Sequence, residues 1–324
     1  MTQPGRHPRL VADLGGTNLR LAVQREENAP LSHVATFACG QHRGLLDAIR
    51  SYLNAERLPA PKEAAIGVAA PIRGDDVRLI NNPTWNFSIN GLRTELGLSR
   101  LEVLNDFAAL AHGVPALKES DLQAVGATTG QAAEARATRI VVGPGTGLGL
   151  AAISMDPQGR PHIISGEGGH STLPAADERE AELLRRLRSE FGHVSAERVV
   201  SGGGLVNLYR AHCAVSALTP QPLDAAGIVE RARAGDDAIC SEVVKCFVGF
   251  LGSFAGNQAL AFGALGGVYL GGGVLSHLGP LFDARWFRER FEAKGRYEAY
   301  LRAIPTWLIV AETPALSGAL AALG

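Results

Sequence analysis

The sequence has almost no excess charge of either sign. Its 31 lysines and arginines are balanced by 32 aspartates and glutamates, which gives a formal net charge of −1. Proteins that bind nucleic acid or an anionic membrane surface usually present a concentration of basic residues. We therefore expect partners that are neither nucleic acid nor membrane.

Long apolar runs are also missing. No stretch of about 18 apolar residues occurs, which is the length needed to cross a bilayer. The N-terminal segment MTQPGRHPRL is polar and lacks the apolar centre of a signal peptide. We therefore expect a cytoplasmic protein.

Cysteine is scarce, and its spacing excludes two common classes of site. The four cysteines form no CxxC pair and no His/Cys cluster with zinc spacing; they are Cys39, Cys213, Cys240 and Cys246. We expect reduced thiols and neither a disulfide framework nor a zinc centre.

Glycine is what the sequence has in quantity, with 39 residues gathered at a few turns. A chain of 324 residues is longer than one hydrophobic core usually supports, which predicts two domains. Strand and helix patterns alternate along the chain, which is typical of an α/β fold with a mixed sheet. The expected strands cover residues 9–23 (a hairpin), 32–37, 62–70, 101–104, 139–153 (a second hairpin), 267–270 and 304–310. The expected helices cover residues 44–55, 107–112, 178–191, 225–235, 241–262 and 315–323.

The first glycine turn lies in Asp13-Leu14-Gly15-Gly16-Thr17, between two apolar strands. Paired glycines let backbone N–H groups approach an anion, and Asp13 is placed to hold a hydrated magnesium ion. A plain hairpin explains the same residues, so this turn alone does not decide between the two interpretations.

A second glycine turn, Gly143 to Gly149, follows about midway along the chain. A dinucleotide fingerprint would require a helix directly after it, but Leu150-Ala151-Ala152-Ile153 continues as a strand. A Walker A loop is excluded because no Gly-Lys-Ser/Thr follows. A phosphate-facing hairpin and a structural turn remain open.

Asn105-Asp106 ends an apolar strand, where α/β folds place their ligands. Asp106 can accept a proton from a substrate hydroxyl, as the aspartate of other phosphoryl-transfer sites does. The alternative is that Asp106 serves as the N-cap of the following helix.

Two further segments have the chemistry of a polyol site. Gly166-Glu167-Gly168-Gly169-His170 places a carboxylate and an imidazole on a flexible backbone, although a solvent loop explains it too. Glu197 follows the helix expected over residues 178–191, and its alternative role is that of a first-turn glutamate of the next helix.

Two triple glycines stand at helix starts, Gly202 to Gly204 and Gly271 to Gly273. The second follows a short apolar strand and would let an adenine ring pack on bare backbone, but a close-packed crossover needs glycine as well. The long apolar segment Val243–Phe262 is either a core element or part of a subunit interface.

Taken in order, these motifs resemble the bacterial glucokinases of the sugar kinase–Hsp70–actin superfamily. The resemblance covers almost the whole chain; its motifs are residues 13–17, 82–85, 104–107, 143–149, 166–170, 193–198, 201–209 and 266–273. It is to the proteobacterial group and not to the ROK group, whose cysteine-rich zinc motif is replaced here by Ser171-Thr172-Leu173-Pro174. No zinc is therefore expected. Pro144 is a departure that removes one amide from the second turn.

The resemblance implies a two-lobed ribonuclease H-like/actin-like ATPase fold, with a mixed sheet in each lobe and a cleft between them. We expect a small domain of residues 1–115 and 303–324 and a large domain of residues 116–302. The implied activity is transfer of the γ-phosphoryl group of ATP to the 6-hydroxyl of glucose, the first step of glucose use in glycolysis, with lobe closure excluding water. A homodimer is also implied.

The resemblance carries specific roles onto this sequence. Asp106 is the implied general base. The implied sugar ligands are Asn105, Asp106, Glu167, His170, Glu197 and Asn82. The implied nucleotide contacts are Asp13, which also orients Mg²⁺, with Leu14, Gly15, Gly16, Thr17, Gly145, Thr146, Gly147, Gly271 and Gly272. Two alternatives remain open: a sugar-sensing regulator, and a kinase for another hexose, an amino sugar or another donor such as polyphosphate.

Overall fold

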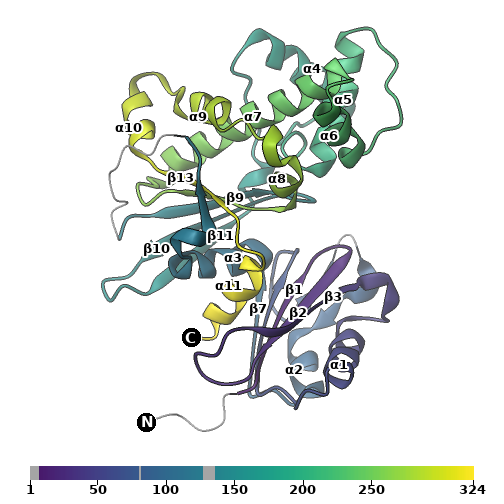
Figure 1. Ribbon diagram of the computed structural model, residues 1–324, viewed down its shortest axis with the longest axis vertical. Helices are drawn as coiled ribbons and strands as arrows, with labels where there is room; N and C mark the ends of the chain where they lie inside the picture. The colour runs from purple at the N-terminus through teal and green to yellow at the C-terminus, as the bar shows by residue number, and fades with distance from the viewer. Residues whose placement is uncertain (1–6, 80–81, 127–135) are drawn as a thin grey trace. The chain divides into compact units, whose positions relative to one another are not determined.

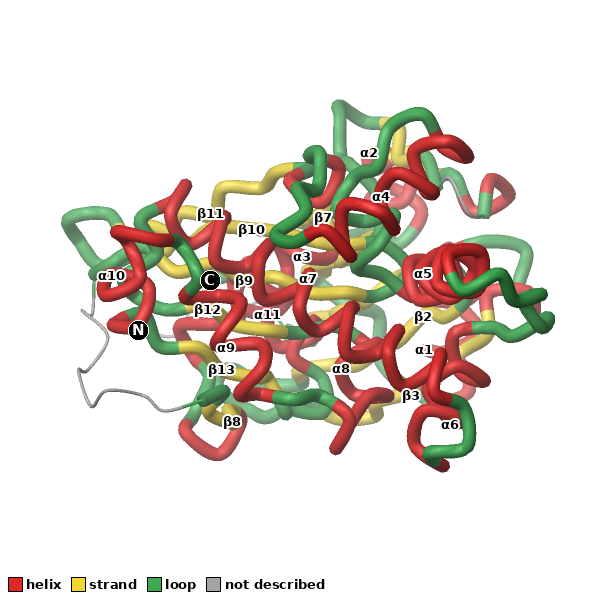
Figure 2. Tube along the Cα trace, turned by 90° about the horizontal axis from the view of Figure 1, so that it is seen from above, coloured by secondary structure: helices red, strands yellow, loops and turns green. Residues whose placement is uncertain are grey.

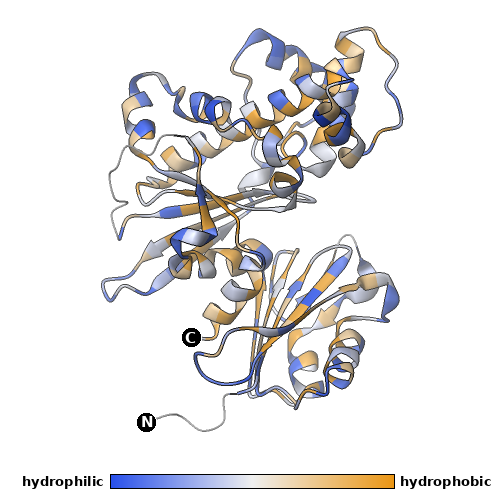
Figure 3. Ribbon diagram, viewed as in Figure 1, coloured by the Kyte–Doolittle hydropathy of each residue, from blue (hydrophilic) through white to orange (hydrophobic). Residues whose placement is uncertain are grey.

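The computed structural model describes residues 7–79, 82–126 and 136–324. They form two compact units, residues 1–118 with 311–324 and residues 119–310. Each unit is built on one mixed sheet, and the apolar strands and helices of each unit are visible in Figure 3.

The first unit contains a five-stranded sheet in the order β3-β2-β1-β4-β7. Its strands are β1 (Arg9–Leu14), β2 (Asn18–Gln24), β3 (Ser32–Ala38), β4 (Glu63–Val68) and β7 (Arg100–Asn105). The first three are antiparallel, whereas β4 and β7 continue the sheet parallel to β1. Every residue of β4 is buried, as expected for a central parallel strand covered on both faces.

Helices of the first unit position the end of β7. They are α1 (Leu45–Ala55), α2 (Ile89–Glu95), α3 (Asp106–Gly113) and α11 (Pro314–Ala322), and a small ladder pairs β5 (Asp76–Val77) with β6 (Phe87–Ser88). Figure 1 shows α11 beside α3. This contact is close because both helices carry glycine there: a Cβ on Gly318 would lie 1.8 Å from the Ala109 carbonyl oxygen.

The second unit repeats this plan. Its six-stranded sheet has the order β11-β10-β9-β12-β13-β8. The strands are β8 (Leu122–Ala124), β9 (Arg139–Pro144), β10 (Leu148–Met155), β11 (Pro161–Gly166), β12 (Val268–Leu270) and β13 (Thr306–Ile309). As in the first sheet, three antiparallel strands are followed by two parallel ones, and β8 is then added antiparallel. The two units thus share the same strand topology over their first five strands.

Helices accompany this second sheet. They are α4 (Glu178–Phe191), α5 (Gly202–Val215), α6 (Ala225–Ala234), α7 (Ala238–Phe262), α8 (Gly273–Leu278), α9 (Ala284–Glu292) and α10 (Glu298–Ala303). Helix α7 packs against α5, α6 and α9, and Figure 2 shows α9 running beside it.

Helix α7 is long and apolar enough by composition to span a bilayer, but 67% of its most apolar window is buried inside the second unit. Its glycines face α9: a Cβ on Gly252 or Gly256 would lie 2.5 Å from the carbonyl oxygens of Phe287 and Phe291, respectively. The glycine-bearing face of this helix is therefore an intramolecular core contact, the first of the two alternatives stated for it.

Three segments differ from the expected pattern or lie outside the described residues. The strand expected over residues 304–310 with the small domain is instead hydrogen-bonded between β12 and β8 of the second sheet. The polar segment of residues 125–138 lies largely outside the described residues. Asn81, which directly precedes the motif of residues 82–85, lies outside them as well.

Candidate functional site

The first glycine turn joins β1 to β2 in the first unit. The Gly15 amide donates to the Asn18 carbonyl oxygen (2.9 Å), and the Cys39 amide donates to the Thr17 carbonyl oxygen (2.8 Å). Thr17 is exposed at the tip. A Cβ on Gly15 would find its nearest neighbour at 3.5 Å, an ordinary contact, so packing does not demand glycine at this position.

Asp13 lies on β1 immediately before this turn. It pairs across the ladder with Arg20, whose guanidinium is 3.9 Å from the carboxylate. Burial raises the pKa of Asp13, and the Arg20 charge acts in the opposite direction. One such carboxylate fits Mg²⁺ bound with a nucleotide, because the phosphates and water supply the remaining ligands. Within residues 7–79, 82–126 and 136–324 no cluster of three or more His, Cys, Asp or Glu side chains could hold a metal by itself.

Asn105 and Asp106 meet where β7 passes into α3. The Asn105 side-chain oxygen accepts from the amides of Phe107 (3.0 Å) and Ala108 (3.4 Å), so Asn105 is the N-cap. Asp106 is the first helical residue, and its carboxylate accepts from the Phe107 amide at 2.9 Å. The alternative that Asp106 is the N-cap is therefore wrong: the adjacent Asn105 takes that role. Asp106 lies at the positive end of the helix dipole, which favours a charged carboxylate.

Asn82 lies in the connection between β5 and β6. Its side-chain oxygen accepts from the Thr84 hydroxyl at 2.9 Å, and a hydrogen bond to the Cys39 thiol is one of the influences on that thiol's pKa, which burial raises overall. Asn82 therefore has partners within the first unit.

The second glycine turn joins β9 to β10 in the second unit. The Gly145 amide donates to the Gly147 carbonyl oxygen (2.8 Å), and the Gly145 carbonyl oxygen accepts from the Gly202 amide at 2.9 Å. Thr146 is exposed at the tip, like Thr17 in the first turn. A strand follows, as expected, which excludes the dinucleotide fingerprint.

The Glu167–His170 loop follows β11 and packs against the start of β10. Glu167 and His170 are exposed, whereas Gly169 is buried. A Cβ on Gly169 would lie 2.1 Å from the Leu148 carbonyl oxygen, so this approach requires glycine. The loop is therefore packed tightly against Leu148, the residue directly after Gly147.

Glu197 lies in a turn between α4 and α5, not in a helix. The alternative of a first-turn glutamate is therefore wrong, because α5 begins five residues later at Gly202. Its backbone amide donates to the Gly169 carbonyl oxygen at 2.8 Å, and its Oε2 accepts from the Leu148 amide at 3.0 Å. Its Oε1 is 3.9 Å from Nδ1 of His170.

The glycines before α8 contact the second turn from another direction. The Gly271 amide donates to the Val142 carbonyl oxygen at 3.0 Å. Gly272 has a φ of +100°, and a Cβ there would lie 2.4 Å from the Pro144 carbonyl oxygen. Backbone conformation and packing alone thus require glycine at 272, and the adenine contact stays a prediction.

Within the second unit, the predicted residues Gly145, Thr146, Gly147, Glu167, His170, Glu197, Gly271 and Gly272 belong to loops that contact one another. The first unit holds Asp13, Leu14, Gly15, Gly16, Thr17, Asn82, Asn105 and Asp106. Sequence reasoning missed the amides of Leu148 and Gly202. The helix start at Gly202 could have been recognised in the sequence, because Ser201 before three glycines is a favourable N-cap. In the structure the Ser201 hydroxyl accepts from the Gly204 amide at 3.0 Å.

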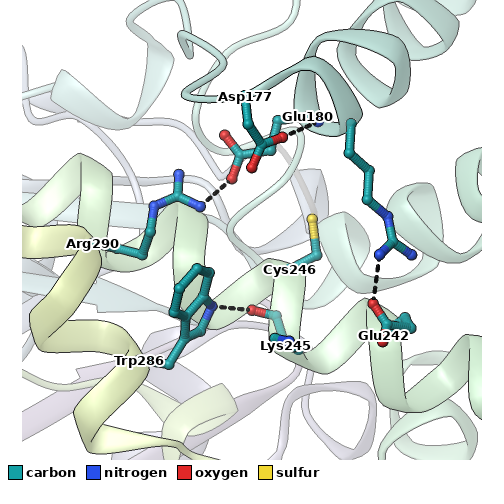
Figure 4. A pocket seen from close by; sticks show the side chains of 8 residues that line it. Asp177, Glu180, Glu242, Lys245, Cys246, Trp286 and Arg290 are labelled. Carbon is teal, nitrogen blue, oxygen red and sulfur yellow. Dashed lines mark hydrogen bonds and ion pairs between the residues drawn. The ribbon is translucent and has the colours of Figure 1, made fainter. Parts of the chain in front are cut away.

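A cavity of about 170 Å³ in the second unit involves none of these residues. Figure 4 shows its charged lining from α4, α7 and α9. Arg290 contacts Glu180 at 2.5 Å, and Arg179 contacts Glu242 at 2.9 Å. These ion pairs connect α4 to α9 and α4 to α7, which is a structural role.

The comparisons with known proteins cover nearly the whole chain. The family model described as glucokinase matches residues 10–324. A glucokinase of Aromatoleum aromaticum is 46% identical over 98% of this chain and 95% of its own length. The crystal structure of a glucokinase from an Antarctic psychrotroph is 38% identical, with a TM-score of 0.86 over 98% of both chains.

A ROK family glucokinase from Streptomyces griseus, solved with glucose and AMPPNP, is 18% identical over 98% of this chain and 100% of its own, with a TM-score of 0.64. At that identity the likeness concerns the fold alone, the actin-like ATPase fold expected from the motifs. The chain belongs to the glucokinase family, and thereby to the ATP-dependent kinases of glucose.

Proposed function

We propose that the residues described above transfer the γ-phosphoryl group of ATP to the 6-hydroxyl of glucose. The observation that carries the proposal is the contact between the second glycine turn and the Glu167–His170 loop, made through Glu197 and Leu148. One loop offers amides and a hydroxyl suited to phosphate, and the other offers groups suited to a polyol. A phosphoryl transfer needs donor and acceptor sites adjacent to each other, because its catalysis is chiefly positioning.

In this proposal Glu167, His170, Glu197, Asn105 and Asn82 hold the sugar hydroxyls. Carboxylates accept hydrogen bonds from hydroxyls and are costly to leave without them once water is excluded. A sugar lacking one of these hydroxyls would lose about 1–3 kcal/mol of binding.

Asp106 acts as the general base. Its position at the N-terminus of α3 favours the ionised form, which can take the proton of the 6-hydroxyl as that oxygen attacks. The hydrogen bond from the Phe107 amide to Oδ1 helps to fix the carboxylate in position.

Asp13 would orient Mg²⁺, and the turns at Gly15–Thr17 and Gly145–Gly147 would receive the phosphates. When bound with ATP, Mg²⁺ supplies neutralisation of the charge on the transferred phosphoryl group. The wider setting is also part of the proposal: the first step of glycolysis, in the cytoplasm, by a homodimer.

A coupled assay crossing glucose, mannose, fructose and glucosamine with ATP, ADP and polyphosphate tests the function. We expect the pair of glucose and ATP to give the highest kcat/KM. A higher value for another sugar or donor would replace the substrate assignment. Glucose binding without turnover by any donor would favour the sugar-sensing regulator.

A further inference from the structure

Glu197 has two separate structural connections, and only one of them concerns the sugar. Its Oε2 accepts a hydrogen bond from the Leu148 amide at 3.0 Å, directly after the Gly145–Gly147 turn. Its backbone amide donates to the Gly169 carbonyl oxygen in the Glu167–His170 loop, and its Oε1 is 3.9 Å from Nδ1 of His170. The carboxylate is thus held by one oxygen, which leaves Oε1 for the sugar.

Gly147 leaves the room that this carboxylate occupies. A Cβ on Gly147 would lie 2.4 Å from Oε2 of Glu197. The atom that would be struck is the end of a flexible side chain, so a methyl group there would displace the carboxylate rather than distort the backbone.

The segment from Glu197 to Gly202 also contacts the Gly145–Gly147 turn at its first residue. The Gly202 amide donates to the Gly145 carbonyl oxygen at 2.9 Å, and the Ser201 hydroxyl donates to the Glu197 carbonyl oxygen at 2.8 Å. One short segment therefore contacts the first residue of the turn and the residue that follows its last.

We propose that Glu197 is a positioning residue for the nucleotide as well as a sugar ligand: through the Leu148 amide it fixes the Gly145–Gly147 turn in its phosphate-binding shape. The inference rests on the proposed function. It adds for Glu197 a role in nucleotide binding that is exerted whether or not a sugar is bound. Leu148 is buried, with 6% of its surface exposed, so water cannot readily replace the carboxylate as acceptor.

The test measures the Kd for ADP with Mg²⁺ by calorimetry, with no sugar present. Glu197→Ala removes the acceptor and should raise this Kd about tenfold. Glu197→Gln keeps a side-chain carbonyl oxygen for the Leu148 amide and should stay within about threefold of wild type, while its Kd for glucose rises. His170→Asn, which changes the sugar loop without touching Leu148, should leave the Kd for ADP within about twofold.

Gly147→Ala provides an independent arm, since it retains Glu197 but displaces its carboxylate. It should raise the Kd for ADP as Glu197→Ala does, and circular dichroism melts should show both variants folded. If Glu197→Ala does not fold, the comparison of Gly147→Ala with Glu197→Gln decides the matter.

An unchanged Kd for ADP in Glu197→Ala or Gly147→Ala would overturn the inference. Equal weakening by Glu197→Gln and Glu197→Ala would also overturn it, because charge and not the hydrogen bond would then be responsible. Failure of the wild-type protein to bind ADP or phosphorylate glucose would instead contradict the proposed function itself.

Discussion

At the scale of single residues, the neighbours Asn105 and Asp106 have different roles, one structural and one proposed to be chemical. Asn105 caps α3 through two backbone amides, which frees Asp106 from the capping role and leaves it in the first turn. Both residue types are good caps, so the sequence alone could not choose between them. Only the observed hydrogen bonds separate the cap from the proposed base.

His212 on α5 predicts a pH dependence of stability. The residue is 3% exposed, and among the described residues its Nε2 has no hydrogen-bond partner. Burial, with a smaller effect of Arg179 and against the influence of Glu242, lowers its pKa from 6.5 to about 4. The unfolded chain therefore binds the proton first, and stability falls as the pH falls from about 6.5 towards 4.

We expect the free energy of unfolding of wild type to drop relative to His212→Gln by about 2 kcal/mol between pH 7 and pH 5. Urea denaturation at the two pH values measures the difference. The exposed His162 provides the control, because His162→Gln should leave the pH dependence unchanged. A pH dependence that His212→Gln does not alter would contradict the assignment.

At the scale of elements, glycines decide how closely helices and turns approach. The contact of α11 with α3 depends on Gly318, because a Cβ added there would lie only 1.8 Å from the Ala109 carbonyl oxygen. A side chain there must push α11 away from the helix that begins with Asp106.

Gly318→Ala should therefore destabilise the first unit by about 1–3 kcal/mol and lower kcat. Urea denaturation and the coupled assay measure the two effects. Ser317→Ala alters the exposed neighbouring position and should change stability by no more than about 0.5 kcal/mol. Equal stabilities of the two variants would show that α11 does not depend on this close approach.

Gly145 offers the opposite case, because a Cβ there would meet nothing within 4 Å. Gly145→Ala should leave the melting temperature unchanged, yet raise the KM for ATP about tenfold if phosphate approaches the turn as proposed. The KM for glucose should hardly change. A normal KM for ATP in a stable variant would mean that the turn is structural.

How much of each element the sequence could predict depended on the range of its interactions. Helix α4 was predicted with its observed bounds, and both hairpins were located, because periodicity and turn glycines are local signals. The strand β13 was assigned to the wrong unit because its partners, β12 and β8, are distant in sequence. The contact of Glu197 with Leu148 spans 49 residues and left no local trace.

At the scale of the whole molecule, the two sheets share one plan, three antiparallel strands followed by two parallel ones. Each plan places a glycine turn between its first two strands, with an exposed threonine at the tip. The repeat explains why two similar turns occur in one chain.

The proposed homodimer is tested at this scale too. Light scattering at working concentration should give twice the chain mass of 34.0 kDa. A value near the mass of one chain would contradict it and leave the kinase assignment intact.

The central claim, that this chain phosphorylates glucose with Asp106 as the base, is tested most directly by Asp106→Asn. The asparagine oxygen can still accept from the Phe107 amide, so the start of α3 should persist. We predict that kcat for glucose with ATP falls about a thousandfold while the Kd for glucose stays within about threefold of wild type. A kcat within tenfold of wild type would contradict the account.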